Sequence, residues 1–163
     1  LGSNPPLLGF ITRPTTVPRH TYQNILDTGY YTINHVHESF IEKAHYTSAK
    51  FDLDECEFEK VNLTKEYKGL PNIPYIAESK LKIGVAFRKE IPIDINQTIM
   101  IIGEVVEIYV VDQAVQPDGK INLNMIDDVC ISGLETYHRV EALSTFPYAR
   151  KEELPDFTNR QQK

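Results

Sequence analysis

The sequence predicts an all-β protein in which an antiparallel sheet closes into a barrel with peripheral helices packed outside. Leu81–Glu90 and Thr98–Val111 are long runs rich in β-branched residues, as strands are. The segment Pro92–Gln97 between them is short enough for a hairpin, which makes the two runs antiparallel neighbours. Gly103 lies inside the second run, and a glycine there indicates the bend or bulge that a barrel corner needs.

The first part of the chain predicts a strand followed by a basic loop. Leu7–Ile11 is an apolar run of strand length, and Thr12–Thr21 carries hydroxyl and basic side chains before a helix begins. Backbone N–H groups at a helix N-terminus lack intrahelical partners and face the positive end of the helix dipole. A phosphate placed there finds donors and favourable charge. Arg13, Arg19 and His20 can add side-chain donors, and arginine can bind a phosphate through two hydrogen bonds.

A short helix is predicted next, beginning at His20 or Thr21 and ending before Gly29, which suits the left-handed position after a helix. Its apolar residues recur at the spacing of one buried face: Tyr22, Ile25 and Leu26. Tyr30–His35 then predicts a strand, because it is rich in aromatic and β-branched residues. A plain strand–helix–strand corner with a solvated loop fits the same pattern, so the phosphate pocket is a hypothesis.

The rest of the chain gives weaker signals. The patterns predict a helix, a turn of helix and a strand: Ser39–Tyr46, Glu55–Val61 and Ile73–Glu78. Pro117–Lys120 predicts a turn in which Gly119 supplies a positive φ. The charged segment Lys151–Lys163 predicts a tail that is loose or packs on a neighbour. We therefore expect one domain over residues 1–150 and a tail over residues 151–163.

Composition narrows the class of partner. A net charge of −6 over 163 residues argues against nucleic acid or an anionic membrane as the main partner. Both of these partners are negatively charged, and an acidic protein does not attract them. The two cysteines, Cys56 and Cys130, form no paired framework, so a reduced, cytoplasmic protein is expected. No apolar run has membrane-spanning length.

A series of short motifs follows one order along the chain: Ser3-Asn4-Pro5-Pro6, Thr12-Arg13-Pro14, Arg19 to Ile25, Thr28 to Asn34, Thr47-Ser48-Ala49, Glu57-Phe58, Ala77-Glu78-Ser79, Ile102 to Val105, Asp118-Gly119-Lys120 and Ser132 to Tyr137. In this order they resemble the flavin reductase-like family of FMN-binding split barrels. The resemblance implies an antiparallel split barrel of Greek-key type. It also places Leu1 partway into the barrel, so we expect leading strands to be missing from this sequence.

The resemblance further implies a homodimer with FMN lying along the barrel at the dimer interface. It places Ser3 and Asn4 beside the flavin ring or the ribityl chain. The phosphate-side candidates are Arg13, Thr15, Thr16, His20 and Thr21. Candidates that border the ribityl phosphate are Asn34, Thr47 and Ser48. For each of these residues a solvated polar role in a loop is the simpler alternative.

The activity that the resemblance implies is NAD(P)H-dependent reduction of flavin, or of an acceptor such as a monooxygenase through bound flavin. Hydride passes directly from nicotinamide to flavin, so the protein mainly supplies position and electrostatics. Tyr137 and His138 are weak candidates for the nicotinamide side, because barrel packing for Tyr137 and a surface position for His138 are the favoured explanations. An FMN-binding electron carrier without enzymatic activity is the main alternative, because fold and cofactor do not fix the reaction.

A third alternative rests on His35 and His37. With Glu42 they resemble the first metal motif of cupin barrels, in which two imidazoles and a carboxylate hold a divalent ion. The second cupin motif is absent downstream, and Glu42 falls in a helical pattern. We therefore expect no metal site, and interpret the two histidines as surface or interface residues.

Overall fold

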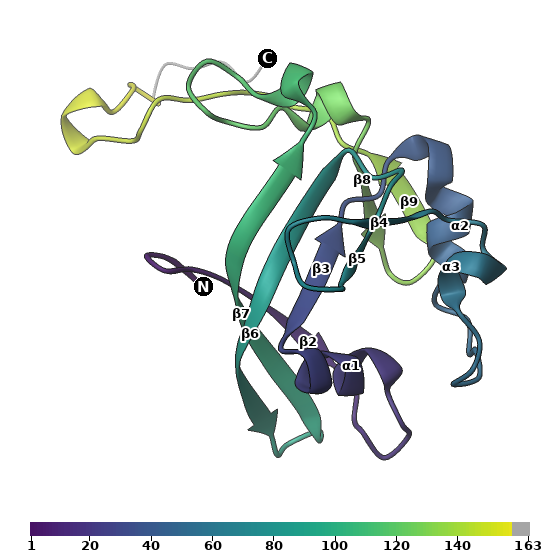
Figure 1. The fold of residues 1–163 in the computed structure, drawn as a ribbon. Helices are drawn as coiled ribbons and strands as arrows, with labels where there is room; N and C mark the ends of the chain where they lie inside the picture. Colours follow the sequence, from purple (N-terminus) through teal and green to yellow (C-terminus); the bar gives the residue numbers. More distant parts are fainter. Residues whose placement is uncertain (158–163) are drawn as a thin grey trace.

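The computed structural model describes residues 1–157 and consists mainly of antiparallel strands (Figure 1). The strands are β1 (Gly2–Ser3), β2 (Pro6–Thr12), β3 (Tyr30–Asn34), β4 (Lys65–Tyr67), β5 (Pro74–Ile76), β6 (Leu81–Ile93), β7 (Thr98–Val110), β8 (Val129–Ser132) and β9 (Thr136–Arg139). The α-helices are α1 (His20–Thr28), α2 (Ile41–Tyr46) and α3 (Glu57–Lys60). Short 3₁₀ helices are η1 (Glu38–Phe40), η2 (Asp112–Ala114), η3 (Leu123–Ile126) and η4 (Lys151–Glu153). The predicted antiparallel all-β class is confirmed.

Five strands form the main sheet in the order β1-β2-β7-β6-β3, and every neighbouring pair is antiparallel. The separate pairs β4–β5 and β8–β9 flank it. The β6–β7 hairpin extends from the Leu81–Val110 pair to the Ile93–Thr98 pair, as the sequence predicted. Its register shifts twice along this length, which bends both strands.

The predicted irregularity at Gly103 is confirmed by one of these shifts, because Gly103 pairs with Phe87 where the register slips. A Cβ atom on Gly103 would lie 2.4 Å from Val85 Cγ1 and 2.6 Å from Tyr31 Oη. Any side chain at this position would therefore displace residues of the core.

Helix α1 covers the lower half of the main sheet, in the orientation of Figure 1. Ile25 packs there against a buried cluster of Tyr31, Val85 and Ile101. Gly29 ends the helix with φ +74° and donates its N–H to the Ile25 carbonyl, as predicted. The prediction that Leu26 shares this buried face is wrong: Leu26 is exposed, because this short helix buries only a narrow stripe.

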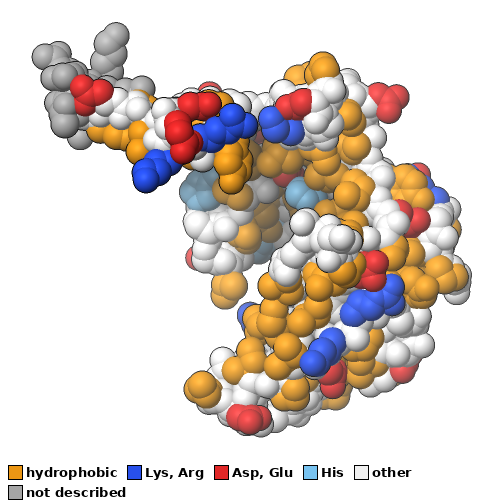
Figure 2. Space-filling model, turned by 90° about the vertical axis from the view of Figure 1, so that its left-hand side faces the viewer, with side chains coloured by type: hydrophobic (Ala, Val, Ile, Leu, Met, Phe, Trp, Pro, Cys, Tyr) orange, Lys and Arg blue, Asp and Glu red, His pale blue; other side chains and the backbone are white. Residues whose placement is uncertain are grey.

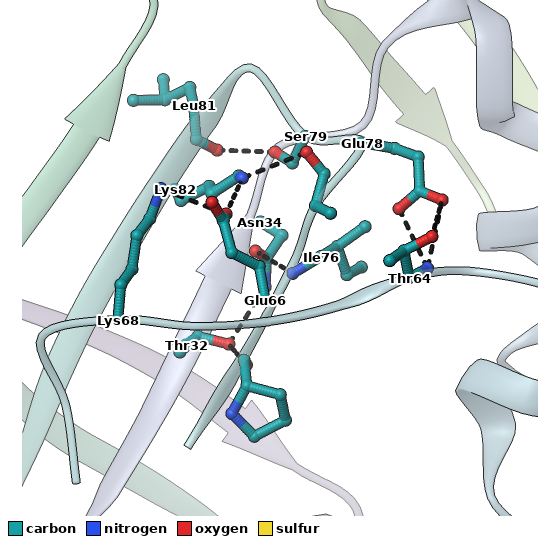
Figure 3. Close-up of polar contacts among 12 residues, drawn as sticks. Thr32, Asn34, Thr64, Glu66, Lys68, Ile76, Glu78, Ser79, Leu81 and Lys82 are labelled. Carbon is teal, nitrogen blue, oxygen red and sulfur yellow. Dashed lines mark hydrogen bonds and ion pairs between the residues drawn. The ribbon is translucent and has the colours of Figure 1, made fainter. Parts of the chain in front are cut away.

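Polar contacts attach the β4–β5 pair to the sheet (Figure 3). The Lys82 side chain is buried, with 5% of the residue exposed; its ammonium binds Glu66 and donates to the Ala77 carbonyl at 3.1 Å. Lys68 also lies 3.1 Å from the Glu66 carboxylate. Burying an ammonium without a partner costs free energy, so the contact with Glu66 is what allows Lys82 to be buried here.

We expect Glu66→Gln to lower the free energy of unfolding by about 1–3 kcal/mol near pH 7, since Lys82 stays buried while Glu66 is partly exposed. The Lys82 ammonium lowers the pKa of Glu66 below 4.5, so this stabilisation is present above that pH and is lost as the pH falls further. Urea unfolding at pH 7 and pH 3 measures it, with Glu59→Gln as the exposed control. An equal difference from the parent at both pH values would contradict the prediction.

Several elements differ from the sequence-based expectation. The helix expected over Ser39–Tyr46 is split into η1 and α2, and the β8–β9 hairpin was not predicted. Within residues 1–157, no helix is long and apolar enough to cross a membrane. Both cysteines are free thiols.

Candidate functional site

A cavity of about 630 Å³ lies where the end of β2, the start of α1 and the loop after α2 meet; we call it the α1 cavity. Its walls come from three segments: residues 10–13, residues 17–21 and residues 47–53, together with Glu57. Five predicted site residues line it: Arg13, His20, Thr21, Thr47 and Ser48. The structure therefore brings together two segments that the sequence analysis had proposed separately.

The N-terminus of α1 opens into this cavity. The helix has nine residues, no side chain caps its first turn, and no acidic residue lies there. Its first backbone N–H groups and the positive end of its dipole are therefore available to an anion. His20 and Thr21 are the first helical residues, and both line the cavity.

The side chain of Arg19 is the strongest indication that the cavity binds an anion. Its backbone carbonyl accepts the Gln23 N–H at 3.0 Å, which fixes Arg19 at the N-cap of α1. Its side-chain Nε is buried and has no hydrogen-bond partner among the described residues. A buried donor of a charged group without a partner costs about 1–3 kcal/mol or more. The residues present thus fit a phosphate, which would supply the missing acceptor.

The other charged side chains of the cavity include both cations and carboxylates. Arg13 and Lys50 are exposed cations on opposite walls, and Asp52 and Glu57 contribute two carboxylates. With Arg19 included, permanent cations exceed carboxylates by one. Asp52 lies in the loop after α2 and Glu57 at the start of α3, so both carboxylates are on the wall that Lys50 shares. The β2–α1 side carries Arg13 and Arg19 without a carboxylate, and a phosphate would be attracted there.

The hydroxyl groups of Thr47 and Ser48 already have acceptors. Thr47 Oγ1 donates to the Ala44 carbonyl at 2.7 Å, and Ser48 Oγ donates to the His45 carbonyl at 2.8 Å. Both bonds satisfy carbonyl groups at the C-terminal end of α2. These residues can therefore accept hydrogen bonds from a ligand, but they donate to it only if the helix end gives up these contacts.

The remaining cofactor candidates lie away from the α1 cavity. Ser3 and Asn4 are exposed in the β1–β2 hairpin, at the opposite end of β2. Seven residues of β2 intervene, which at about 3.3 Å per residue is roughly 20 Å. Thr15 and Thr16 are exposed in the loop but do not line the cavity.

Asn34 lies in the polar contacts of Figure 3. Its side-chain oxygen accepts the Ile76 N–H at 3.0 Å, and its amide group donates to Thr32 Oγ1 at 3.0 Å. Asn34 therefore joins β3 to β5, and the α1 cavity does not include it.

A second pocket of about 440 Å³ lies on the other side of α2, against the β8–β9 hairpin. Tyr137 lines it, with its hydroxyl 3.4 Å from His45 Nδ1 and the two rings in edge contact. Adjacent residues of a strand face opposite sides, and His138 accordingly points away, with its Nε2 2.8 Å from Ser132 Oγ. Of the two nicotinamide-side candidates, Tyr137 therefore lines this pocket and His138 does not.

The comparisons with known proteins identify the family. The model of the flavin reductase like domain matches residues 1–127. The chain belongs to the flavin reductase-like family. A protein from Shewanella frigidimarina NCIMB 400, described as a flavin reductase with a split barrel domain, superposes with a TM-score of 0.84. It shares 51% sequence identity, over 91% of this chain and 74% of that chain.

Two further comparisons show what else the chain is similar to. Component B of nitrilotriacetate monooxygenase from Bacillus cereus has the same fold, with a TM-score of 0.79, 20% identity, and 90% of this chain and 74% of that chain covered. An uncharacterized protein of Aquifex aeolicus is 31% identical over 127 residues, which is 76% of this chain and 62% of that protein. The chain thus spans less than two thirds of the length of this curated relative.

Membership of the flavin reductase-like family gives no support to the cupin-like alternative. His35 Nδ1 lies 2.9 Å from Asp128 Oδ2, and His37 Nε2 lies 2.8 Å from the Glu78 carbonyl. These bonds join the chain after β3 to the residues before β6 and before β8. In the described part of the chain, no group of three or more His, Cys, Asp or Glu side chains could hold a metal ion.

Sequence reasoning missed some residues of the α1 cavity. Lys50 had a usable signal, because it directly follows the Thr47-Ser48-Ala49 motif. Phe51 and Leu53 had none, since they lie in a polar segment between the two predicted helical stretches.

Proposed function

We propose that this protein binds FMN and catalyses NAD(P)H-dependent reduction of flavin, or of an acceptor through bound flavin. The observation that carries the proposal is the unpartnered, buried Nε of Arg19 beside an uncapped helix N-terminus, in a chain of the flavin reductase-like family. This arrangement supports binding of one phosphate group, which is the anionic end of FMN. When bound, the flavin supplies the chemistry of accepting a hydride.

Different residues of the α1 cavity would contact different parts of the bound FMN phosphate. Arg19 and the first N–H groups of α1 would hold the phosphate, while Arg13 and His20 would add charge and a donor at its entrance. Phe10 and Ile11 line the adjoining wall and would keep water from the phosphate contacts. We expect Ser3 and Asn4 to contact the ring or ribityl part, and Tyr137 to face the nicotinamide.

We further propose that the protein is cytoplasmic, that it forms a homodimer, and that it passes electrons to an acceptor. Similarity in fold to component B of a monooxygenase supports an acceptor of that kind. An FMN-binding electron carrier is the competing function. It shares the cofactor site, so only a reaction with a nicotinamide separates the two.

We expect the purified protein to bind FMN, and its flavin absorbance to bleach when NADH or NADPH is added without oxygen. Titration with FMN, FAD and riboflavin, followed by each nicotinamide, measures both steps. FMN should bind more tightly than riboflavin, because FMN carries a phosphate for Arg19 that riboflavin lacks. Binding of FMN without bleaching by either nicotinamide would favour the carrier, and equal affinities for FMN and riboflavin would contradict the phosphate site.

A further inference from the structure

His37 and Ser39 form a hydrogen-bonded pair in the chain after β3, and neither residue lines the α1 cavity. Ser39 Oγ lies 3.1 Å from His37 Nδ1. On the other side of the ring, His37 Nε2 lies 2.8 Å from the carbonyl oxygen of Glu78. A carbonyl oxygen can only accept, so Nε2 carries the hydrogen, and Nδ1 of the neutral ring accepts the hydroxyl of Ser39. The three groups therefore stand in the order hydroxyl, base and acceptor that a serine nucleophile needs.

The surroundings of His37 hold its ring in this orientation. The chain has five histidines, and Figure 2 shows side chains of some of them, in pale blue, at the molecular surface. His37 is buried, with 8% of the residue exposed, and its ring packs edge-on against Phe40 with 4.7 Å between the ring centroids. Glu78 is fixed too, because its carboxylate accepts hydrogen bonds from the N–H and the hydroxyl of Thr64 (Figure 3). His37 is therefore pre-organised to take a proton from Ser39.

The hydroxyl of Ser39 is accessible to a ligand. Ser39 is exposed and lines the pocket of about 440 Å³ between α2 and the β8–β9 hairpin, which we call the α2 pocket. Ile41, Tyr46 and Tyr137 line the same pocket and offer apolar surface to the acyl or aryl part of a small molecule. The pocket is also lined by three carboxylates: Glu38, Glu42 and Glu135. This lining favours a neutral or positively charged ligand over an anion.

Two further groups can stabilise the charges that develop when Ser39 attacks a carbonyl carbon. The hydroxyl of Tyr137 lies 3.4 Å from His45 Nδ1, which is longer than an ordinary hydrogen bond of a hydroxyl group. It can therefore turn towards a ligand in the α2 pocket and donate to an oxyanion. The pKa of Asp127 is lowered chiefly by Lys80 and also by the charge of His37, so this carboxylate stabilises the protonated ring in return.

We propose that the α2 pocket is a serine esterase site for small neutral or positively charged esters, with Ser39 as the nucleophile and His37 as the general base. Ser39 Oγ bonds to the ester carbonyl carbon while its proton passes to His37 Nδ1; the bond to the alcohol oxygen then breaks, and the alcohol leaves with that proton. Water next attacks the acyl group and gives a proton to Nδ1, and the oxygen of Ser39 leaves and takes this proton back. One ester and one water become one acid and one alcohol. The reaction needs neither oxidant nor reductant, so it lies beyond the proposed reduction of flavin.

Labelling of the full chain with a fluorophosphonate, without flavin, tests the nucleophile directly. We expect the label on Ser39, because an activated serine displaces the fluoride of this reagent. Ser39→Ala should lose the label, and Ser132→Ala should keep it. Ser132 is the matched control: its Oγ lies 2.8 Å from His138 Nε2, but neither residue lines the α2 pocket. A parent protein that takes no label, or a label that persists in Ser39→Ala, would overturn the proposal.

Hydrolysis of p-nitrophenyl acetate measures the reaction itself. We expect Ser39→Ala to lower the rate due to the protein by about 100-fold or more. His37→Gln should lose as much, because glutamine can donate to the Glu78 carbonyl but has no ring nitrogen that accepts a proton. Circular dichroism verifies folding, and the exposed position of Ser39 keeps Ser39→Ala decisive if His37→Gln does not fold. Equal rates for Ser39→Ala and the parent would contradict the proposal.

The charge of the ester tests the assignment to the α2 pocket. The substrates 4-acetoxybenzamide and 4-acetoxybenzoate differ in one negative charge, and their rates are corrected for hydrolysis in buffer. We expect the neutral ester to react about fivefold faster or more, because Glu42 and Glu135 repel the carboxylate. Glu42→Gln/Glu135→Gln should remove most of this preference. A preference that the double variant retains in full would show that the ester binds elsewhere.

These measurements involve neither flavin nor a nicotinamide. Ester hydrolysis that depends on Ser39, in a protein that NADH and NADPH do not bleach, would leave the esterase site standing and remove the reductase. A protein that reduces flavin but takes no label on Ser39 would do the reverse.

Discussion

Replacing Glu107 by alanine is expected to lower the free energy of unfolding by about 3–5 kcal/mol, which for a chain of this size corresponds to a fall in melting temperature of roughly 6–20 °C. Glu107 lies on β7 and accepts hydrogen bonds from three groups. They are the hydroxyl of Tyr75, the N–H of Leu70 at 3.1 Å and the hydroxyl of Tyr109 at 3.3 Å. The substitution removes all three acceptor contacts at once.

The expected loss is large because two of these donors, on Tyr75 and Leu70, are buried and cannot turn to water. Tyr75 is fully buried, at 0% exposure, and burial together with Glu107 raises the pKa of its hydroxyl. Each buried donor left without a partner costs about 1–3 kcal/mol. The surroundings are also built closely around Glu107, since a Cβ on Gly84 would lie 2.5 Å from its Cγ. The alanine variant therefore adds a cavity to the lost hydrogen bonds.

Two controls separate these causes. Glu107→Gln keeps an acceptor oxygen and nearly the same volume, so we expect a loss of only about 1–2 kcal/mol. Adding Tyr75→Phe to Glu107→Ala removes the unpartnered hydroxyl, and the double variant should lose less than the sum of the two single changes. Urea unfolding followed by circular dichroism measures the parent and the four variants: Glu107→Ala, Glu107→Gln, Tyr75→Phe and the double variant. A Glu107→Ala protein within about 1 kcal/mol of the parent would show that Glu107 does not organise this part of the sheet.

Elements with a strong local pattern could be predicted from the sequence. β-Branched residues fill β6 and β7, and a short turn joins them, so both strands and their pairing were predicted. Gly29 predicted the end of α1, because its positive φ is a local requirement. The β8–β9 hairpin could not be predicted, since its four-residue strands are largely exposed and show no alternation.

The candidate site was predictable only in part. The start of α1 could be proposed as an anion site, because helix termini have the same chemistry in any fold. That the loop after α2 forms the opposite wall depends on packing between segments distant in sequence, which no local pattern encodes. For the same reason, the sequence analysis recognised both Arg13 and Arg19 as possible donors but chose only Arg13 as a phosphate-side candidate. The structure distinguishes them, since Arg13 is exposed and Arg19 Nε is buried.

This difference leads to the second large effect. We expect Arg19→Ala to weaken FMN binding by about 1.5–3 kcal/mol, or roughly 10-fold to 150-fold, because a charge-assisted hydrogen bond from a buried donor is lost. Arg13→Ala should have a smaller effect, since water screens an exposed cation. Fluorescence titration of the variants with FMN measures both, and an Arg13→Ala loss that exceeds the Arg19→Ala loss would contradict the assignment.

Riboflavin provides the control ligand for Arg19. It lacks the phosphate, so its affinity should be the same for the parent and for Arg19→Ala, and the difference between the two ligands isolates the phosphate contact. The stability of the ligand-free protein gives an independent check. Removing a donor that has no partner also removes its desolvation cost, so Arg19→Ala should unfold at the same urea concentration as the parent or a higher one. A residue kept for folding alone would behave in the opposite way, losing stability without discriminating between FMN and riboflavin.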